Sequence, residues 1–106
     1  MQDKVLSSLG LAKRAGKVIV GTQMVQDAVR SGKAVLIIYA SDISDNSKKK
    51  LVNTCAHYSS ELISYSDMQG LSAALGQKKL ITSAAITDEN FKLLIKKQLS
   101  ELTEND

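Results

Sequence analysis

LGLAKRAGKVIVGTQMVQDAVRSGKAVLIIYASDISDNSKKKL, which runs from Leu9 to Leu51, is the stretch of this sequence that decides the fold. It contains most of the positive charge of the chain, and three of its glycines, Gly16, Gly21 and Gly32, lie around two short apolar runs. The segment after Gly21 has the pattern of a helix. A glycine turn that leads into a helix N-terminus, with lysines and arginines nearby, is typical of an anion-binding site. Because nucleic acid is the main strong polyanion in a cell, the pattern favours a small RNA-binding domain.

The length of 106 residues predicts a single domain, residues 1–106, with one modest hydrophobic core. Apolar residues make up 43% of the chain and charged residues 24%, which is the composition of a soluble globular domain. The longest apolar run, Ala34–Ala40, is too short to cross a bilayer, and Met1–Lys4 lacks the features of a signal peptide. We therefore expect a cytoplasmic protein without membrane contact.

The net charge of +3 conceals an asymmetry between the two halves of the chain. Residues 1–50 contain nine Lys or Arg and four Asp or Glu, a balance of +5, whereas residues 51–106 contain five and seven, a balance of −2. The basic residues are thus concentrated where the glycines lie, which indicates a directed surface. For Lys48-Lys49-Lys50 alone, a solvated helix face is an equally good interpretation.

Residue types that serve catalysis or metal binding are scarce. Cys55 is the only cysteine, so no intramolecular disulfide can form, and we interpret it as a small buried hydrophobe. His57 is the only histidine, and it falls near the end of a predicted helix, where we expect it to be partly exposed. The sequence contains no nucleophile–base set, no phosphate-binding P-loop and no dinucleotide fingerprint. We expect no enzymatic activity, no catalytic or metal-binding residues, and no cofactor.

Helical and strand-like patterns alternate along the chain. The spacing of apolar and turn residues predicts helices at 3–15, 22–31, 45–57, 66–75 and from about 88 onward, and strands at 17–20, 34–40, 61–65 and 80–86. This alternation predicts an α/β fold in which a sheet lies between layers of helices. The acidic tail, Glu101–Asp106, is expected to fray.

The same patterns assign residues to helix caps and buried faces. Ser66-Asp67-Met68-Gln69 fits a capping box, and Thr22 either caps the second helix or offers its hydroxyl to a ligand. Either of two neighbouring residues can cap the third helix and the last one, namely Ser44 or Asp45 and Thr87 or Asp88. The residues expected to face the core are Met24, Val25, Ala28 and Val29 in the second helix, Leu51, Val52 and Cys55 in the third, Met68, Leu71, Ala74 and Leu75 in the fourth, and Phe91, Leu94, Ile95 and Leu99 in the last.

Basic residues cluster next to the turns, where their side chains can reach outward. The clusters are Lys13, Arg14 and Lys17 around Gly16, Arg30 and Lys33 around Gly32, Lys48 to Lys50 after the central strand, and Lys78 and Lys79 before the last strand. The chain has one Phe, three Tyr and no Trp, so it is poorly suited to stacking single-stranded bases on aromatic side chains. The pattern favours structured RNA, recognised by its shape, its backbone charge and a few base edges.

Gly21-Thr22-Gln23 suits that mode of recognition. Gly21 permits the close approach of an RNA backbone, and Gln23 carries both a donor and an acceptor for a base edge. The unpaired N–H groups of the first helical turn attract a phosphate or the acceptor edge of a base. Taken alone, the tripeptide also fits an ordinary helix start.

Three strings of this stretch, LGLAKRAGKVIVGTQ, AVRSGKAVLIIYASD and SDNSKKKL, resemble the L7Ae/L30e superfamily of kink-turn RNA-binding ribosomal proteins, and its small bacterial YlxQ-type branch in particular. A later block, from LSAALG to KKLITSAAIT, resembles the second part of the same fold, so the resemblance extends from about Val5 to Leu99. It implies a three-layer α/β/α sandwich with a four-stranded mixed β-sheet, as in L30e. It also implies binding to a kink-turn, a sharply bent RNA with tandem sheared G·A pairs.

The resemblance implies roles for individual residues. In the superfamily, the glycine-led start of the second helix enters the groove at the sheared pairs, a role that falls here to Gly21-Thr22-Gln23. The basic residue before that turn corresponds to Lys17. The loop that packs beside the bulged nucleotide corresponds to Lys79, Leu80, Ile81 and Thr82.

The sequence departs from the superfamily pattern at four positions of this segment. Gln23, Met24 and Asp27 stand where Asn, Glu and Lys are usual, and Val20 stands where a lysine precedes the glycine. Gln23 can replace Asn with a longer reach, but Met24 cannot accept a hydrogen bond as Glu does, and Asp27 repels phosphate. The departures leave the expected fold unchanged and affect the expected affinity and RNA preference.

Together, these arguments give thirteen predicted RNA-binding residues: Lys13, Arg14, Lys17, Gly21, Thr22, Gln23, Arg30, Lys33, Lys48, Lys79, Leu80, Ile81 and Thr82. We expect the cations that flank Gly16 and Gly32 to converge on one face with Gly21. The expected partner is a structured RNA, ribosomal or kink-turn-like, bound by a monomer that acts in ribosome assembly or translation. The alternative is a protein–protein interaction module on the same fold, which docks on a translation factor or a ribosomal protein.

Overall fold

The computed structural model describes residues 3–104, and its elements follow the predicted alternation. They are α1 (Lys4–Arg14), β1 (Val18–Val20), α2 (Thr22–Arg30), β2 (Leu36–Tyr39), α3 (Asp45–His57), β3 (Glu61–Ser64), α4 (Met68–Ala74), β4 (Ser83–Ile86) and α5 (Glu89–Glu104). Strand β4 begins three residues later than predicted, so Leu80–Thr82 belong to the preceding loop. Helix α5 continues to Glu104, within the tail that was expected to fray, and the last two residues of that tail lie outside the described residues.

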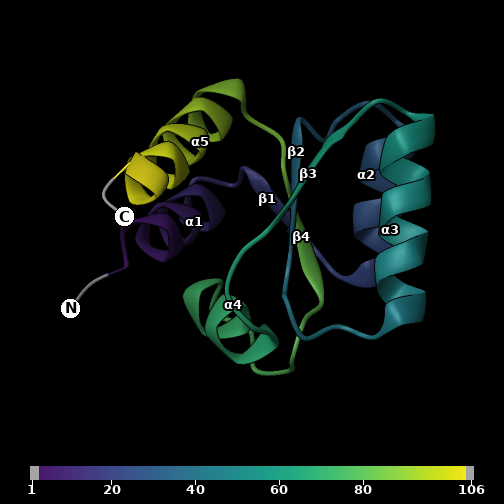
Figure 1. Cartoon of the computed structure of the whole chain (residues 1–106), viewed down its shortest axis with the longest axis horizontal. Coiled ribbons are helices and arrows are strands. Elements are labelled where there is room, and N and C mark those ends of the chain that lie inside the picture. The colour runs from purple at the N-terminus through teal and green to yellow at the C-terminus, as the bar shows by residue number, and fades with distance from the viewer. Residues whose placement is uncertain (1–2, 105–106) are drawn as a thin grey trace.

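The elements form three layers. The four strands are ordered β1-β4-β2-β3, with β4 antiparallel to both of its neighbours and β3 parallel to β2. Helices α1, α4 and α5 cover one face of this sheet, and α2 and α3 cover the other (Figure 1). This is the α/β/α sandwich with a mixed four-stranded sheet that the sequence predicts. Among residues 3–104, no helix has the length and apolar character that a bilayer crossing requires.

Strand β2 lies in the interior of the sheet and is covered on both faces. Leu36, Ile37 and Ile38 are completely buried. Leu36 and Ile38 pack with the helices of the α1 side, whereas Ile37 packs with α2 and α3. The alternation arises because successive side chains of a strand point to opposite faces. The continuous apolar run in the sequence therefore reflects two hydrophobic cores, one on each side of the sheet. The prediction of a single core from the chain length is wrong, because the central sheet separates the buried side chains into two groups.

The sheet has two ends with different loops. Tyr39, the last residue of β2, pairs with Ser83, the first of β4, and with Ser64, the last of β3. The loops after β1, β2 and β3 and the loop before β4 therefore meet at one end, which we call the Gly21 end (residues 21, 40–44, 65–67 and 77–82). The opposite end, which we call the Lys17 end, comprises residues 15–17, 31–35, 58–60 and 87–88.

Three exposed residues correct the predicted helix faces. Met24, Val52 and Leu94 are expected in the core but are 59%, 42% and 39% exposed, respectively. The buried face of α2 is rotated about the helix axis relative to the predicted face. Gln26, which is only 6% exposed, therefore faces inward in place of Met24. In α3 and α5, the stripe in contact with the sheet is narrower than predicted, and residues beside it remain at the surface.

Two predicted caps are also corrected. Asp67 rather than Ser66 caps α4, and its Oδ1 accepts a hydrogen bond from the Gly70 N–H at 2.7 Å. Ser66 has a positive φ of 64° and belongs to the turn before the helix. Thr22 does not cap α2 but is its first residue, because the N-cap is Gly21. The start of α2 therefore differs from that of an ordinary capped helix.

Candidate nucleic-acid interface

The start of α2 leaves backbone donors open at the Gly21 end of the sheet. Gly21 is the N-cap and has no side chain, so no capping oxygen reaches the N–H groups of the first turn. The other four helices in residues 3–104 each have a side chain that accepts from the first turn, from Asp3, Ser44, Asp67 and Asp88. Unpaired amides and the positive end of the helix dipole attract an anion or a base acceptor edge.

Gly21 is required here by its backbone conformation. Its φ of +103° lies in a region that residues with a Cβ rarely adopt. A Cβ at this position would have Met24 Cγ as its nearest neighbour, at 3.9 Å, which is an ordinary contact. The glycine therefore sets the turn without relieving any internal crowding, and the surface in front of it is open to a ligand.

The loop before β4 is fixed beside the start of α2. Thr22 Oγ1 lies 3.4 Å from Thr82 Oγ1. The Thr82 carbonyl accepts from the Ala40 N–H at 2.9 Å, and the Ile81 N–H donates to Ser72 Oγ at 2.8 Å. The structure thus places Thr82, the last residue of that loop, beside Thr22 at the start of α2.

Two large apolar side chains are exposed on these segments. Met24 in the first turn of α2 is 59% exposed, and Leu80 in the adjoining loop is 63% exposed. Each can pack against a flat apolar surface such as a nucleobase. Single exposed apolar residues are common, so their meaning here comes from their position beside the open helix start.

Gln23 already has a partner on its own helix. Its Nε2 donates to Asp27 Oδ1 at 3.0 Å, and the same oxygen lies 3.7 Å from Arg30 Nη1. The arginine offsets part of the Asp27 charge, although both side chains are exposed and the attraction is therefore weak. A ligand can replace the exposed Gln23 bond at little loss, because such bonds contribute about 0.5–1.5 kcal/mol net.

The predicted cations divide between the two ends of the sheet, so the expected convergence on Gly21 is wrong. Five of them lie at or beside the Lys17 end: Lys13, Arg14, Lys17, Arg30 and Lys33. Two of them lie at or beside the Gly21 end: Lys48, in the first turns of α3, and Lys79, in the loop before β4.

The division follows from the lengths and directions of β1 and α2. The Lys17 carbonyl accepts from the Thr87 N–H at 2.9 Å, which places Lys17 beside the start of α5. From there, β1 runs along the sheet to Gly21, a span of about 13 Å. Helix α2 then runs back over about 12 Å, so Arg30 and Lys33 return to the Lys17 end. Gly16 and Gly32 are thus at the opposite end from Gly21.

A hollow of about 120 Å³, which we call the α2–α3 hollow, adjoins Thr22 at the Gly21 end. It lies between the first turns of two helices and the loop before β4. Its lining residues are Thr22, Gln26, Asn46, Ser47, Lys50, Leu51 and Thr82. Five of these are absent from the thirteen predicted RNA-binding residues, namely Gln26, Asn46, Ser47, Lys50 and Leu51, although Lys50 belongs to the predicted basic cluster Lys48 to Lys50. The available signal was Gln26, a polar residue within the apolar stripe of α2.

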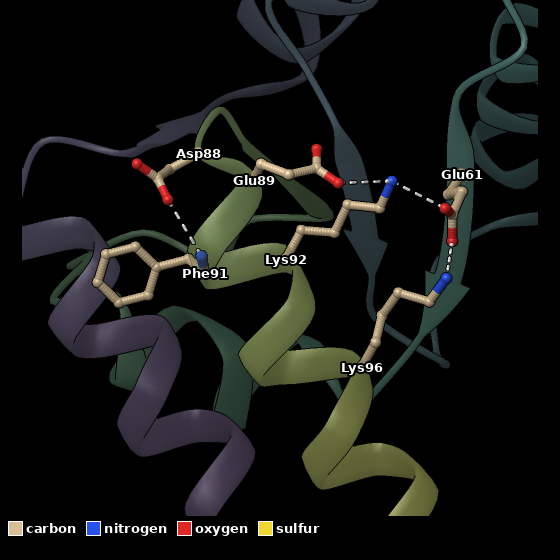
Figure 2. Close-up of polar contacts among 6 residues, drawn as sticks. All are labelled: Glu61, Asp88, Glu89, Phe91, Lys92 and Lys96. Atoms are coloured by element: carbon tan, nitrogen blue, oxygen red, sulfur yellow. Dashed lines mark hydrogen bonds and ion pairs between the residues drawn. The ribbon is translucent and has the colours of Figure 1, made fainter.

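A separate charged cluster ties α5 to the edge strand β3 (Figure 2). Lys92 Nζ lies 2.9 Å from Glu61 Oε1 and 3.6 Å from Glu89 Oε1, and Lys96 Nζ lies 2.6 Å from Glu61 Oε2. Hydrogen bonds from Lys96 and then Lys92 hold the pKa of Glu61 below its usual value. The hydrogen bond to Glu61 in turn raises the pKa of Lys92. Because these lysines are paired, we assign the cluster to the packing of α5.

Cys55 and His57 have the surroundings that the sequence predicts. Cys55 is 2% exposed on the inner face of α3, and its burial raises the pKa of the thiol. His57 is the exposed last residue of α3, and its ring meets Tyr58 edge-to-face at 4.8 Å between centroids. In the part of the chain that is described, no three His, Cys, Asp or Glu side chains come together as a metal site.

The fold and this surface define a small α/β/α domain that presents one uncapped helix N-terminus beside a fixed loop. The chain belongs to the Ribosomal protein L7Ae/L30e/S12e/Gadd45 family, whose sequence model matches residues 3–95. It is 31% identical over 83 residues to the RNA-binding protein YlxQ of Bacillus subtilis (strain 168), which covers 78% of this chain and 82% of that protein. It is also 37% identical over 57 residues to the RNA-binding protein YlxQ of Enterococcus faecium, which covers 54% and 55%.

Solved structures have the same architecture. A Bacillus halodurans protein of unknown function superimposes with a TM-score of 0.87 at 30% identity, over 93% of this chain and 99% of that one. The Giardia lamblia 15.5kD RNA binding protein superimposes with a TM-score of 0.76 at 15% identity, over 98% and 92%. At 15% identity, the similarity to the Giardia lamblia protein shows a shared fold and nothing more. The superfamily resemblance and the YlxQ-type branch inferred from the sequence are confirmed.

Proposed function

We propose that this protein binds structured RNA at the Gly21 end of its sheet, through the start of α2 and the loop before β4. One observation carries the proposal: α2 leaves its first-turn amides open beside that loop, whereas the other four helices in residues 3–104 have side-chain caps. The names of the YlxQ relatives support RNA as the ligand. The protein acts without enzymatic activity, as a cytoplasmic monomer.

The RNA best matched to this surface is a kink-turn, in ribosomal RNA or another structured RNA. The first turn of α2 enters the groove at the sheared G·A pairs, where Gly21 permits close approach and Gln23 contacts a base edge. Leu80 packs beside the bulged nucleotide, and Lys79 neutralises a phosphate. Support for this arrangement comes from the position of Thr82 beside Thr22, at 3.4 Å between their hydroxyl oxygens, in a loop that is held by the hydrogen bonds of Thr82 and Ile81 to Ala40 and Ser72.

Met24 and Asp27 give this surface a different chemistry from that of a typical kink-turn binder. The exposed thioether of Met24 offers an apolar contact where a glutamate would accept a hydrogen bond. Asp27 keeps a negative charge near the RNA backbone, only partly offset by Arg30. We therefore expect the protein to bind RNA more weakly than a variant with lysine at position 27. We also expect it to prefer base pairs that require fewer hydrogen-bond acceptors from the protein.

The test compares aspartate substitutions at two glycines with positive φ. Gly21→Asp puts a carboxylate in front of the open amides and should lower the affinity for a kink-turn RNA at least about 100-fold, because it blocks the helix start and repels phosphate. Gly32→Asp introduces the same charge at the Lys17 end, where φ is +78° and no atom lies within 4 Å of the added Cβ. It should leave the affinity within about threefold of the wild type.

Affinity is measured by fluorescence anisotropy, and folding of both variants by thermal denaturation followed by circular dichroism. The proposal fails if folded Gly21→Asp binds the RNA as well as Gly32→Asp does.

A protein–protein interaction module is the second candidate, and the exposed Met24 and Leu80 side chains favour it. In that case, a translation factor or a ribosomal protein would cover the Gly21 end. Co-purification of a protein partner that survives nuclease treatment, with equal and weak affinity for unrelated RNAs, would support this candidate over RNA recognition.

A further inference from the structure

We propose that the α2–α3 hollow binds one phosphate group. The inference deepens the proposed function when the phosphate belongs to an RNA backbone, but the hollow can also be tested with no RNA present. The chemistry of its lining, the two helix starts that border it and a buried amide without a partner support the proposal independently.

Apart from Leu51, which provides an apolar wall, every residue that lines the hollow carries a hydrogen-bond donor, and none is acidic. Three hydroxyls, two carboxamides and one ammonium line it, from Thr22, Ser47, Thr82, Gln26, Asn46 and Lys50. A group with several acceptor oxygens and a negative charge matches this set. The volume of about 120 Å³ holds a phosphate group but is too small for a whole nucleotide.

Two helix N-termini border the hollow. Thr22 is the first residue of α2, whose N-cap glycine provides no side-chain oxygen. Asn46 and Ser47 belong to the first turn of α3. Helix dipoles that converge at their positive ends favour an anion between them, and the ammonium of Lys50 adds a full charge.

The amide of Gln26 points independently to a missing ligand. Gln26 is 6% exposed, and its Oε1 accepts from Thr54 Oγ1 at 2.6 Å. Its Nε2 is buried and has no hydrogen-bond partner within residues 3–104. A buried donor without an acceptor is unfavourable, and an apolar residue at this position would continue the apolar face of α2. A phosphate oxygen in the hollow would supply the acceptor.

The first experiment titrates inorganic phosphate into the ¹⁵N-labelled full chain at constant ionic strength, with chloride as the balancing ion. We expect saturable shifts of the Thr22 backbone amide and of the Gln26 side-chain NH₂. Lys50→Gln should weaken phosphate binding about tenfold, because it removes the one ammonium of the lining.

Lys49→Gln is the matched control. Lys49 precedes Lys50 on the same helix but does not line the hollow, so its substitution should change phosphate affinity less than twofold. Chemical shifts that do not saturate with phosphate would overturn the proposal. An equal loss of phosphate affinity in Lys50→Gln and Lys49→Gln would overturn it as well.

Gln26→Leu tests the role of the buried amide. The substitution keeps an apolar volume in the stripe of α2 and removes the unpaired donor. Phosphate affinity should fall at least threefold while the variant remains folded. An unchanged affinity in the folded variant would contradict the assignment of Gln26 to the ligand.

The source of the phosphate is identified with a kink-turn RNA. If the RNA backbone fills the hollow, inorganic phosphate should compete with the RNA, and Lys50→Gln should reduce the slope of log K against log salt by about 0.9 whereas Lys49→Gln should not. If phosphate binds but both variants keep the wild-type slope, the ligand is a free phosphate compound.

Gln23→Ala separates this inference from the proposed function. Gln23 does not line the hollow, so the substitution should weaken RNA binding and leave the phosphate titration unchanged. If Gln23→Ala leaves the RNA affinity unchanged while phosphate still saturates, the proposed base contact of Gln23 is contradicted. The assignment of phosphate binding to the α2–α3 hollow then still holds.

Discussion

Gly21 has a φ of +103°, and its position as the N-cap of α2 leaves the first turn without a side-chain acceptor. Replacing an N-cap Ser, Thr, Asp or Asn by Ala typically costs about 1 kcal/mol, but replacing it by Gly costs only about a few tenths of that, so Gly21 leaves the amides open at little loss of stability. Among the described residues, the other helices obtain such a contact from Asp3, Ser44, Asp67 and Asp88. Its absence at α2 is understandable if a ligand supplies the acceptors instead.

Asp27 is the residue whose substitution should strengthen RNA binding. Its carboxylate holds the Gln23 amide at 3.0 Å and carries a charge that repels phosphate. Asp27→Lys removes both effects, so the affinity for a kink-turn RNA should rise about three- to tenfold at low salt. Anisotropy titrations at two salt concentrations measure the gain.

Glu101→Lys makes the same change of charge near the end of α5, far along the chain from α2, and serves as the control. Helix α5 covers the opposite face of the sheet from α2 (Figure 1). An equal gain from Glu101→Lys would mean that net charge, rather than the position of Asp27, determines the affinity.

At the scale of elements, Glu61 connects α5 to β3 through Lys92 and Lys96 (Figure 2). Because the pKa of Glu61 is lowered in the folded state, its contribution to stability is present above the ordinary value of 4.5 and is lost as the pH falls through the lowered pKa. Glu61→Gln should therefore reduce the melting temperature at pH 7, by no more than about 4 °C for so exposed a cluster.

Thermal melts of the wild type and the variant at pH 7 and at a pH well below the lowered pKa of Glu61 check this prediction. The difference between the two proteins should disappear at the acid pH. A substitution of Glu89, which has a single 3.6 Å contact to Lys92, should have a smaller effect. A difference that is as large in acid as at pH 7 would show that the ionised carboxylate is not its cause.

The order and type of the elements could be predicted because glycines and caps divide the sequence into segments with clear periods. The burial of individual side chains was less predictable where the sequence pattern is compatible with two alternative buried faces or caps. Met24 and Gln26 are both compatible with a helical face that includes Val25 and Val29, and only the packing of α2 on the sheet selects Gln26. Ser66 and Asp67 compete in the same way for one cap, and the turn before α4 decides between them.

At the scale of the whole molecule, the division into two ends determines which predicted site residues can act together. The resemblance assigns RNA contacts to both the helix start and the loop before β4, and the structure places the two segments side by side at Thr22 and Thr82. The arrangement of the cations could not be predicted, because proximity to a glycine in the sequence does not reveal at which end of the sheet that glycine lies. The α2–α3 hollow was also out of reach, since α2, α3 and the loop before β4 build it jointly.

The two ends should differ in their contribution to RNA binding. Replacing Lys48 and Lys79 together with Gln should reduce the slope of log K against log salt by about 1.8, because two phosphate contacts are lost. Replacing Lys17 and Lys33 together with Gln removes the same charge from the Lys17 end and should leave the slope nearly unchanged for a short RNA. The account of the Gly21 end is contradicted if the second pair has the larger effect.

The most direct measurement of the central claim maps a short kink-turn RNA onto the ¹⁵N-labelled protein by chemical-shift perturbation. We predict that the perturbed amides lie in Gly21-Thr22-Gln23, in Met24 and in the loop at 77–82, while those around Gly16 and Gly32 stay at their free positions. Perturbations centred on Gly16 and Gly32, or an RNA that leaves the start of α2 unaffected, would contradict it.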